Sequence, residues 1–465
     1  MRAGEFQQEG LRCGPLLPII GRREPKSMWL FRVTRSIDWP VSMSSLEFPD
    51  GGFCPTINSF SVVDLARRYG TPTYVYDAAV IRRQVERLRQ FEVIRYAQKA
   101  NSNLAVLDLL RRLGVVVDAV SAGELLRARA AGYALASEPP EVVYTADIFD
   151  REALELVVKE GTHVNCGSPD MLDQYGERCP GQGVTLRINP GFGHGHSQKT
   201  NTGGPQSKHG IWHTQLEECV QRGQKWGLRV TGLHMHIGSG TDFEHLSQVC
   251  EAMVQAARRI GPSIHSISAG GGLPTPYRNS DQPLDIARYH QLWDGARRQL
   301  ESEWGHPVRL ELEPGRYPVA EAGYLITEIR AVKRMGDNLF YLVDAGFNNL
   351  ARPILYGAYH PLAVALANPQ TQQATQPVIV GGPLCESGDI FTQTDGGTVV
   401  HRQLPAANVG DYLVIGCAGA YGFVMGSNYN SKPLAAEVLL DRGSDHLVRP
   451  RQGSASLFAS ESIPG

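Results

Sequence analysis

The sequence predicts an α/β barrel of eight βα units with a second, all-β domain after it. From residue 93 onward, short β-branched runs alternate with amphipathic stretches of helical spacing, the pattern that builds parallel sheets through right-handed crossovers. Eight such runs can be counted, enough to close a (β/α)8 TIM-like barrel. After Pro314 the pattern changes to short strands separated by glycine- and proline-rich turns, which is typical of an all-β domain.

The barrel strands are predicted from apolar, mostly β-branched runs bounded by turn residues. Between them, Leu104–Leu113 is predicted as a helix that ends at Gly114, and apolar residues from Leu246 to Ile260 recur at helical spacing. The predicted strands are Val93–Lys99, Val115–Val120, Val142–Ala146, His163–Gly167, Thr185–Asn189, Val230–Ile237, Ile264–Ala269 and Val308–Glu313.

The second domain is predicted to contain the strands Phe340–Asp344, Pro377–Val380 and Tyr412–Ile415. The segment Thr73–Asp77, which precedes the barrel, is also strand-like, so we expect this domain to take strands from both ends of the chain. The expected organisation is a disordered extension over 1–45, a segment of the β-domain over 46–79, the barrel over 80–325, the β-domain over 326–450 and a tail over 451–465.

Composition narrows the class of partner. The chain has 47 acidic and 45 basic residues, a formal charge of -2, which gives no reason to expect a nucleic acid or an anionic membrane. Its eight cysteines contain no CxxC pair, and no apolar stretch approaches the roughly 18 residues of a membrane span. We therefore expect a cytoplasmic protein that acts on small molecules.

Lys99 stands where the apolar run that begins at Val93 gives way to turn residues. In a barrel, the carboxyl end of a strand is where catalytic groups collect, and a partly desolvated lysine there can bond to an aldehyde cofactor. Most lysines are solvated surface residues, so the interpretation depends on what stands at the other strand ends.

His234 and His236 alternate along the sixth predicted strand and face the same way, with Gly238 and Ser239 opening a loop. Two histidines on one face can bind a metal, or can place an imidazole flat against an aromatic cofactor; a core histidine is the third reading. A metal site needs further His or Asp ligands at other strand ends, whereas the seventh and eighth predicted strands offer glycines, Glu313 and Arg316 instead.

The seventh and eighth predicted strands end in groups that suit a phosphorylated heterocycle. Gly270, Gly271 and Gly272 let backbone N–H groups approach an anion, while Glu313 can contact a heterocyclic nitrogen and Arg316 can hold phosphate or carboxylate. Pyridoxal phosphate needs a lysine for its aldehyde, donors for its phosphate, a flat imidazole for its ring and a carboxylate for its pyridine nitrogen. Lys99, the glycines with Arg316, one of the two histidines and Glu313 offer these four groups.

With these residues in place, the chain resembles the barrel-type (fold type III) pyridoxal-phosphate decarboxylases, whose fold is that of alanine racemase and ornithine decarboxylase. Among them it is most similar to the bacterial diaminopimelate decarboxylases. The resemblance runs from about residue 57 to 450, in the motifs YAQKANSN, HMHIGSG, SAGGG, EPGR, LARPILY, GPLCESGD, GAYG and SNYNSKP, which occur in the family's order. Lys432 departs from it, because many relatives carry arginine there.

The resemblance implies a role for each residue. Lys99 bonds to the cofactor, His236 stacks on its ring and Glu313 contacts its pyridine nitrogen. Cys385 matches the family's catalytic acid. The other residues implied to bind cofactor are Ser239, Gly272, Pro314, Gly315, Arg316 and Tyr421, and those implied to bind substrate are Arg316, Arg352, Tyr356, Glu386 and Tyr421.

The resemblance also implies the reaction, which is decarboxylation of meso-2,6-diaminopimelate to L-lysine and carbon dioxide, the last step of lysine biosynthesis, with pyridoxal 5′-phosphate and no metal. It further implies a homodimer in which Cys385 and Glu386 reach the site of the other subunit. A decarboxylase of another amino acid or of a carboxylated polyamine is the main alternative, because few side chains choose the substrate. A metal-dependent hydrolase and a non-catalytic regulator are weaker alternatives.

Overall fold

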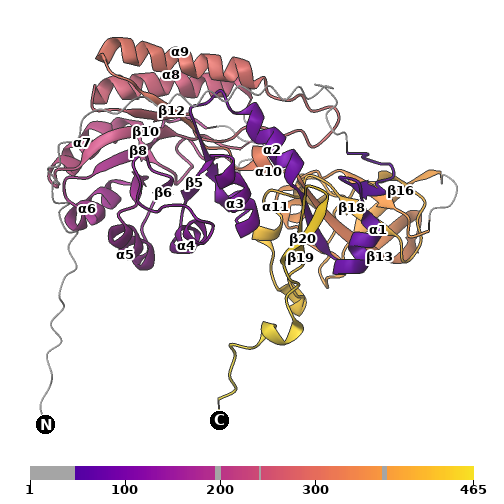
Figure 1. Cartoon of the computed structure of the whole chain (residues 1–465). Helices are drawn as coiled ribbons and strands as arrows, with labels where there is room; N and C mark the ends of the chain where they lie inside the picture. Colours follow the sequence, from indigo (N-terminus) through magenta and orange to yellow (C-terminus); the bar gives the residue numbers. More distant parts are fainter. Residues whose placement is uncertain (1–47, 194–200, 240–241, 369–373, 465) are drawn as a thin grey trace, which may run out of the picture.

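In a computed structural model of the chain, the described residues are 48–193, 201–239, 242–368 and 374–464, so the expected extension over 1–45 lies outside them. The described chain forms a barrel with helices around it and, beside it, a domain rich in β-strands (Figure 1). The predicted fold class is confirmed.

Eight parallel strands form a closed ring. Each pairs with the next in order, and the pairing of β12 with β4 and of β8 with β10 closes the barrel. A two-residue strand that the sequence did not predict, β9 (Ile211–Trp212), extends the sheet beside β8. The eight strands are β4 (Val93–Ala97), β5 (Val116–Ala119), β6 (Val142–Ala146), β7 (His163–Cys166), β8 (Gly183–Asn189), β10 (Arg229–Met235), β11 (Ser266–Ser268) and β12 (Arg309–Leu312).

The helices cover the outside of the barrel because each carries an apolar face. In α8 (Phe243–Ile260) that face is the predicted one, with Leu246, Val249 and Met253 buried. Asp242 caps its amino end and Gly261, with φ +91°, follows its last turn. The other helices of this part are α2 (Ala78–Arg87), α3 (Leu104–Arg112), α4 (Ala122–Ala130), α5 (Arg151–Glu160), α6 (Pro169–Arg178), α7 (Leu216–Gln224) and α9 (Ile286–Trp304). The four-residue helix α10 (Arg316–Val319) is different, because all of its residues are buried.

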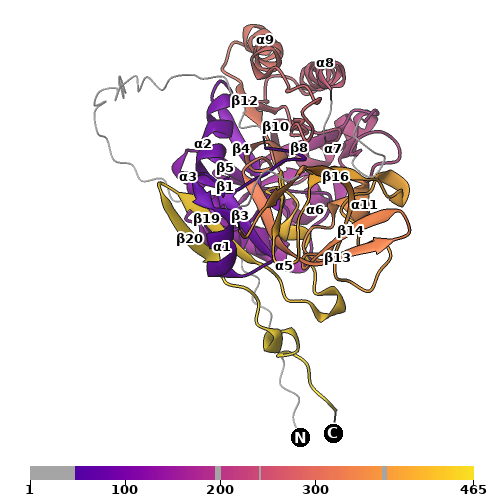
Figure 2. The same cartoon turned by 90° about the vertical axis from the view of Figure 1, so that its right-hand side faces the viewer.

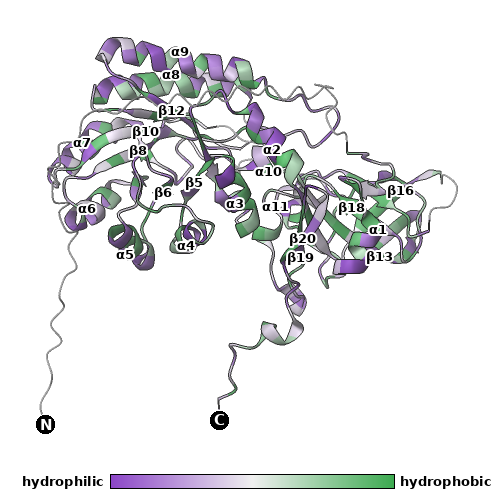
Figure 3. Cartoon of the chain, in the orientation of Figure 1, coloured by the Kyte–Doolittle hydropathy of each residue, from purple (hydrophilic) through white to green (hydrophobic). Residues whose placement is uncertain are grey.

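The second sheet draws strands from both ends of the chain. The long strand β13 (Gly323–Met335) lies next to β3 (Thr73–Asp77), and β3 in turn pairs with β19 (Ala436–Asp441). Figure 2 views the molecule from this side, and Figure 3 shows hydrophobic residues concentrated in these strands. The remaining strands are β14 (Asn338–Val343), β15 (Leu362–Ala365), β16 (Thr375–Gly381), β17 (Arg402–Pro405), β18 (Tyr412–Ile415) and β20 (Ser444–Arg449).

A short amino-terminal unit closes one face of this sheet. The strands β1 (Thr56–Ile57) and β2 (Phe60–Ser61) lead into α1 (Val62–Tyr69), whose residues Val62 and Leu65 pack in a small core with Ile326 and Val438. The large core is continuous between the barrel and the β-domain. The two parts are therefore packed on each other, and the carboxyl ends of the barrel strands face the β-domain.

Candidate active site

The carboxyl ends of the barrel strands surround a cavity of about 110 Å³, called the ring cavity below. Its lining includes every residue that the sequence analysis assigned to the cofactor, namely Lys99, His236, Ser239, Gly272, Glu313, Pro314, Gly315, Arg316 and Tyr421. Eight of these follow the strands β4, β10, β11 and β12, whereas Tyr421 comes from the loop after β18. The cavity is therefore built jointly by the barrel and the β-domain.

Lys99 lies in a 3-10 turn, Gln98–Ala100, and not in a strand as the sequence analysis expected, because β4 ends at Ala97. The chain turns here to meet the β-domain: Tyr421 donates its backbone N–H to Ala100 O at 2.8 Å, and the Asn101 side chain donates to Gly419 O at 3.1 Å. Lys99 is exposed to the cavity, where its amine can reach a bound aldehyde.

Asp118, at the end of β5, also lines the ring cavity although the sequence analysis did not single it out. Burial, together with the nearby charge of Glu313, raises the pKa of this carboxyl to about 6. Among the described residues its Oδ1 has no hydrogen-bond partner. A buried polar atom without a partner is costly, so the cavity has unmet capacity for a polar ligand.

His236 is fixed as a neutral ring. Its Nδ1 accepts the backbone N–H of Gly271 at 3.1 Å, and burial, with the charges of Arg187 and Lys99, holds its pKa well below the usual range. The glycine loop approaches closely, because a Cβ on Gly270 would lie 2.1 Å from Met235 O and one on Gly271 would lie 2.4 Å from Glu313 O. Only glycine fits these two positions.

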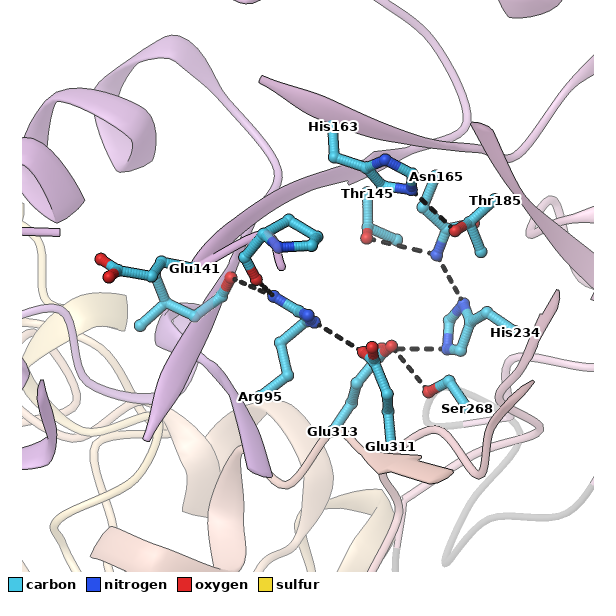
Figure 4. Close-up of polar contacts among 12 residues, drawn as sticks. Arg95, Glu141, Thr145, His163, Asn165, Thr185, His234, Ser268, Glu311 and Glu313 are labelled. Atoms are coloured by element: carbon cyan, nitrogen blue, oxygen red, sulfur yellow. Dashed lines mark hydrogen bonds and ion pairs between the residues drawn. The ribbon is translucent and has the colours of Figure 1, made fainter. Parts of the chain in front are cut away.

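Glu313 is held by two side chains at its two oxygens (Figure 4). Ser268 Oγ donates to Oε1 at 2.8 Å, and His234 Nε2 lies 3.0 Å from Oε2. Burial alone would raise the pKa of Glu313, but His234, Ser268 and the charge of Arg95 outweigh burial and lower that pKa to about 2. The carboxylate is therefore ionised at neutral pH.

These residues fit pyridoxal phosphate. The lysine amine suits an aldehyde, the neutral imidazole of His236 suits a ring face, and an ionised Glu313 suits a protonated pyridine nitrogen. The glycine loop, Ser239 and Arg316 offer backbone, hydroxyl and guanidinium donors for a phosphate.

A second cavity of about 680 Å³, called the outer cavity below, adjoins the first. Lys99, Ser239, Arg316 and Tyr421 line both cavities. The outer cavity is also lined by Arg352 and Tyr356, which lie at the two ends of α11 (Arg352–Tyr356). Of the five predicted substrate residues, four are thus brought together here.

Besides Asp118, two residues that contact the arginines of this site were missed by the sequence analysis. Tyr277 OH accepts from Arg316 Nη1 at 2.6 Å and from Arg352 Nη1 at 3.0 Å. His360 Nδ1 donates to Gly416 O, and its Nε2 accepts from Arg352 Nη1, each at 3.0 Å. Tyr277 lies in a loop and His360 precedes β15, so no periodic pattern or motif pointed to either of them.

Arg316 and Arg352 are buried, 8% and 6% exposed, and among the described residues neither pairs with a carboxylate. Burial lowers the pKa of Arg352, and the like charge of Arg316 lowers it further. Two buried cations of this kind are stabilised by anions that enter the cavity from outside.

Cys385 and Glu386 lie apart from this site. Both are exposed, in the loop after β16, where Cys385 N donates to Asn430 Oδ1 at 2.8 Å. Neither Cys385 nor Glu386 is among the described residues that line the ring cavity or the outer cavity. The cysteine beside the outer cavity's arginines is instead Cys417, whose thiol has a pKa raised by burial.

Within the described ranges, no group of three or more His, Cys, Asp or Glu side chains is arranged to hold a metal ion. The nitrogens of His234 face Asn165 and Glu313. None of the described helices combines the length and the apolar character needed to cross a membrane.

Comparison with known proteins agrees with this geometry. The family described as "pyridoxal-dependent decarboxylase, pyridoxal binding domain" matches residues 78–320. The diaminopimelate decarboxylase of Streptomyces coelicolor is 55% identical over 86% of this chain and 91% of its own length. A crystal structure of a diaminopimelate decarboxylase superposes with a TM-score of 0.84 at 52% identity, covering 86% of this chain and 96% of that one. The Helicobacter pylori diaminopimelate decarboxylase complexed with L-lysine gives 0.77 at 30% identity, covering 86% and 98%.

Proposed function

The chain belongs to the diaminopimelate decarboxylases, within the pyridoxal-dependent decarboxylase family, and on this basis we propose which residues carry the reaction. It catalyses decarboxylation of meso-2,6-diaminopimelate to L-lysine and carbon dioxide, the last step of lysine biosynthesis. Pyridoxal 5′-phosphate binds in the ring cavity. The support for this is that the nine residues needed for its aldehyde, ring and phosphate line that one cavity.

Pyridoxal phosphate, when bound, supplies an electron-poor ring that accepts the electron pair left when the carboxylate departs. Lys99 holds the cofactor through its amine, and the neutral imidazole of His236 lies against the ring. Glu313, ionised at neutral pH, keeps a proton on the pyridine nitrogen and so keeps the ring electron-poor. Ser239, Gly272, Arg316 and Tyr421 hold the phosphate.

The observation that carries the substrate assignment is the buried pair Arg316 and Arg352, which share the hydroxyl of Tyr277 and have no carboxylate partner among the described residues. A substrate with two carboxylates supplies the missing anions. Arg352 binds the distal carboxylate, with Tyr356 and Tyr421 beside it. This arrangement disfavours lysine and ornithine, which lack that carboxylate.

Cys385 gives a proton to the carbon that has lost carbon dioxide, and Glu386 binds the distal amino group of the substrate. Because both residues are exposed and lie outside the two cavities of their own chain, we propose that they serve the site of a second copy in a head-to-tail homodimer. A reducing cytoplasm suits this exposed thiol and the buried thiols of Cys54, Cys166, Cys219, Cys250 and Cys417, which form no disulfide.

The direct test is incubation of purified protein with pyridoxal phosphate and meso-diaminopimelate, with lysine and carbon dioxide as readouts. The wild type should be coloured and should release both products in equal amounts. Lys99→Ala should lose the colour and nearly all turnover. An active, coloured Lys99→Ala protein would contradict the role of Lys99, and rapid ornithine decarboxylation by the wild type would contradict that of Arg352.

The shared site is tested by mixing chains. Lys99→Ala and Cys385→Ala each disable one component of the site, so a mixed dimer contains one site in which both components are intact. Some activity should return when the two inactive proteins are unfolded and refolded together. No recovery in dimers shown by mass spectrometry to be mixed would contradict sharing.

A further inference from the structure

His234 has no place in the contacts proposed for cofactor or substrate, although it precedes His236 by two residues on β10. It is 2% exposed and lines the ring cavity beside Glu313. Its Nδ1 lies 3.0 Å from Asn165 Nδ2 and its Nε2 lies 3.0 Å from Glu313 Oε2 (Figure 4). The imidazole therefore bridges an amide and the carboxylate that serves the ring.

The contacts of Asn165 determine which nitrogen of His234 carries the proton. An amide nitrogen can only donate, so Nδ1 of His234 accepts and the proton of the neutral ring is at Nε2, facing Glu313. Asn165 itself is 1% exposed, and its Nδ2 also donates to Thr145 Oγ1 at 3.3 Å. A buried amide held in this way orients the ring so that Nε2, with its proton, lies 3.0 Å from Glu313 Oε2.

Glu313 needs such support because it separates two cavities. On its other side lies a polar cavity of about 380 Å³, lined among others by Arg95, Glu311 and Asn165. The charge of Arg95 attracts Glu313 toward this cavity, although Arg95 Nε already pairs with Glu311 Oε2 at 3.0 Å. Figure 4 shows Arg95 and His234 approaching the two glutamates from opposite sides.

We propose that His234, oriented by Asn165, is a positioning residue that holds Glu313 ionised and directed into the ring cavity. The consequence for chemistry rests on the proposed binding of pyridoxal phosphate there. Without the Nε2 proton, one oxygen of a buried carboxylate loses the polar group that lies 3.0 Å from it. The carboxyl group then takes up a proton more readily and turns more easily toward Arg95, and both changes weaken its hold on the ring nitrogen.

The test compares four variants. His234→Leu removes the donor, whereas His234→Gln keeps an N–H near the position of Nε2. Asn165→Leu keeps the imidazole but removes the amide that orients it, together with the hydrogen bond of that amide to Thr145. His163→Leu is the matched control, because His163 is a half-buried histidine of the same barrel whose Nε2 contacts Thr185 Oγ1 at 2.9 Å and not Glu313.

Two readouts report on Glu313 rather than on folding. Infrared spectroscopy of the apo protein, with Glu313→Gln subtracted to assign the band, follows protonation of the carboxyl against pH. The ¹⁵N shift of ring-labelled pyridoxal phosphate in the holoenzyme reports the proton on the pyridine nitrogen. The other charged or titratable groups facing Glu313 stay constant in all four variants; they are Arg95, Lys99, Asp118, His236 and Glu311.

In His234→Leu and Asn165→Leu, Glu313 should be protonated at higher pH than in the wild type, and the ¹⁵N shift should move toward the unprotonated ring. The value of kcat should fall about ten- to a hundredfold in His234→Leu, the loss expected when a buried charge loses one polar partner. His234→Gln should recover most of it, and His163→Leu should match the wild type.

The proposal is overturned if His234→Leu leaves the titration of Glu313 and the ¹⁵N shift unchanged, or if His163→Leu alters them equally. Should His234→Leu fail to fold, Asn165→Leu and His234→Gln decide the question by the same two readouts. A wild type that binds no pyridoxal phosphate would contradict the proposed function instead, and the titration in the apo protein would still decide whether His234 holds Glu313.

Discussion

Replacing Arg352 by methionine should separate the two ends of the substrate. Methionine has a similar length and no charge, and Arg352 is 6% exposed, so its contact with a carboxylate is little screened by solvent. Loss of a charge-assisted hydrogen bond costs about 1.5–3 kcal/mol, which is about a tenfold to 150-fold loss in kcat/KM for meso-diaminopimelate. The contact is present before and during the reaction, so the loss should appear mainly in KM.

The assay pairs meso-diaminopimelate with D-lysine, which keeps the reacting D-centre but lacks the distal carboxylate. The wild type should strongly prefer meso-diaminopimelate, and Arg352→Met should lose that preference because turnover of D-lysine should barely change. Removing an unpaired buried charge should not lower the free energy of unfolding of the apo protein. Arg330→Met, at an exposed arginine of β13 that pairs with Glu328, is the control and should behave as the wild type. An equal loss for both substrates would refute the assignment of Arg352 to the distal carboxylate.

Two further predictions concern residues that only the structure revealed. Tyr277→Phe removes the hydroxyl that accepts from both Arg316 and Arg352. In steady-state kinetics, KM for meso-diaminopimelate should therefore rise about tenfold while kcat stays nearly unchanged. An unchanged KM would show that the hydroxyl does not organise the two arginines. Asp118 has a pKa raised from 3.8 to about 6, so the folded apo protein binds more protons than the unfolded chain between these pH values, and its stability should fall as pH rises through them. The free energy of unfolding, measured by urea unfolding at pH 4 and pH 7, should fall by at most about 3 kcal/mol in the wild type, and Asp118→Asn should not show this fall. The same pH dependence in the wild type and in Asp118→Asn would contradict the raised pKa.

The barrel could be predicted because its signals are local. A buried parallel strand needs a short β-branched run, and each of the eight predicted runs overlaps an observed strand. The ends of the strands were predicted less accurately. The strand predicted to reach Lys99 stops two residues earlier, at Ala97, because Ala100 and Asn101 contact the β-domain. These contacts join segments more than 300 residues apart and leave no mark in the local pattern.

The β-domain was predicted only in part. Its longest strand, β13, was missed because its second half, Val332–Met335, is exposed and basic and lacks the alternation of a half-buried strand. Pairing with β14 makes this segment a strand, through the contacts Val332 with Tyr341 and Arg334 with Leu339. Strand structure imposed by a neighbour is a tertiary effect and overrides local preference.

By itself, the sequence determined the order of βα units and the chemistry at each strand end, because residue type and position along a strand decide which groups reach the rim of a barrel. Only the tertiary structure decided how those groups act on one another. That Tyr277 joins Arg316 to Arg352, and that His234 supports Glu313, depends on distances between side chains from separate elements, since electrostatic and hydrogen-bond energies follow separation and burial and not position in the chain.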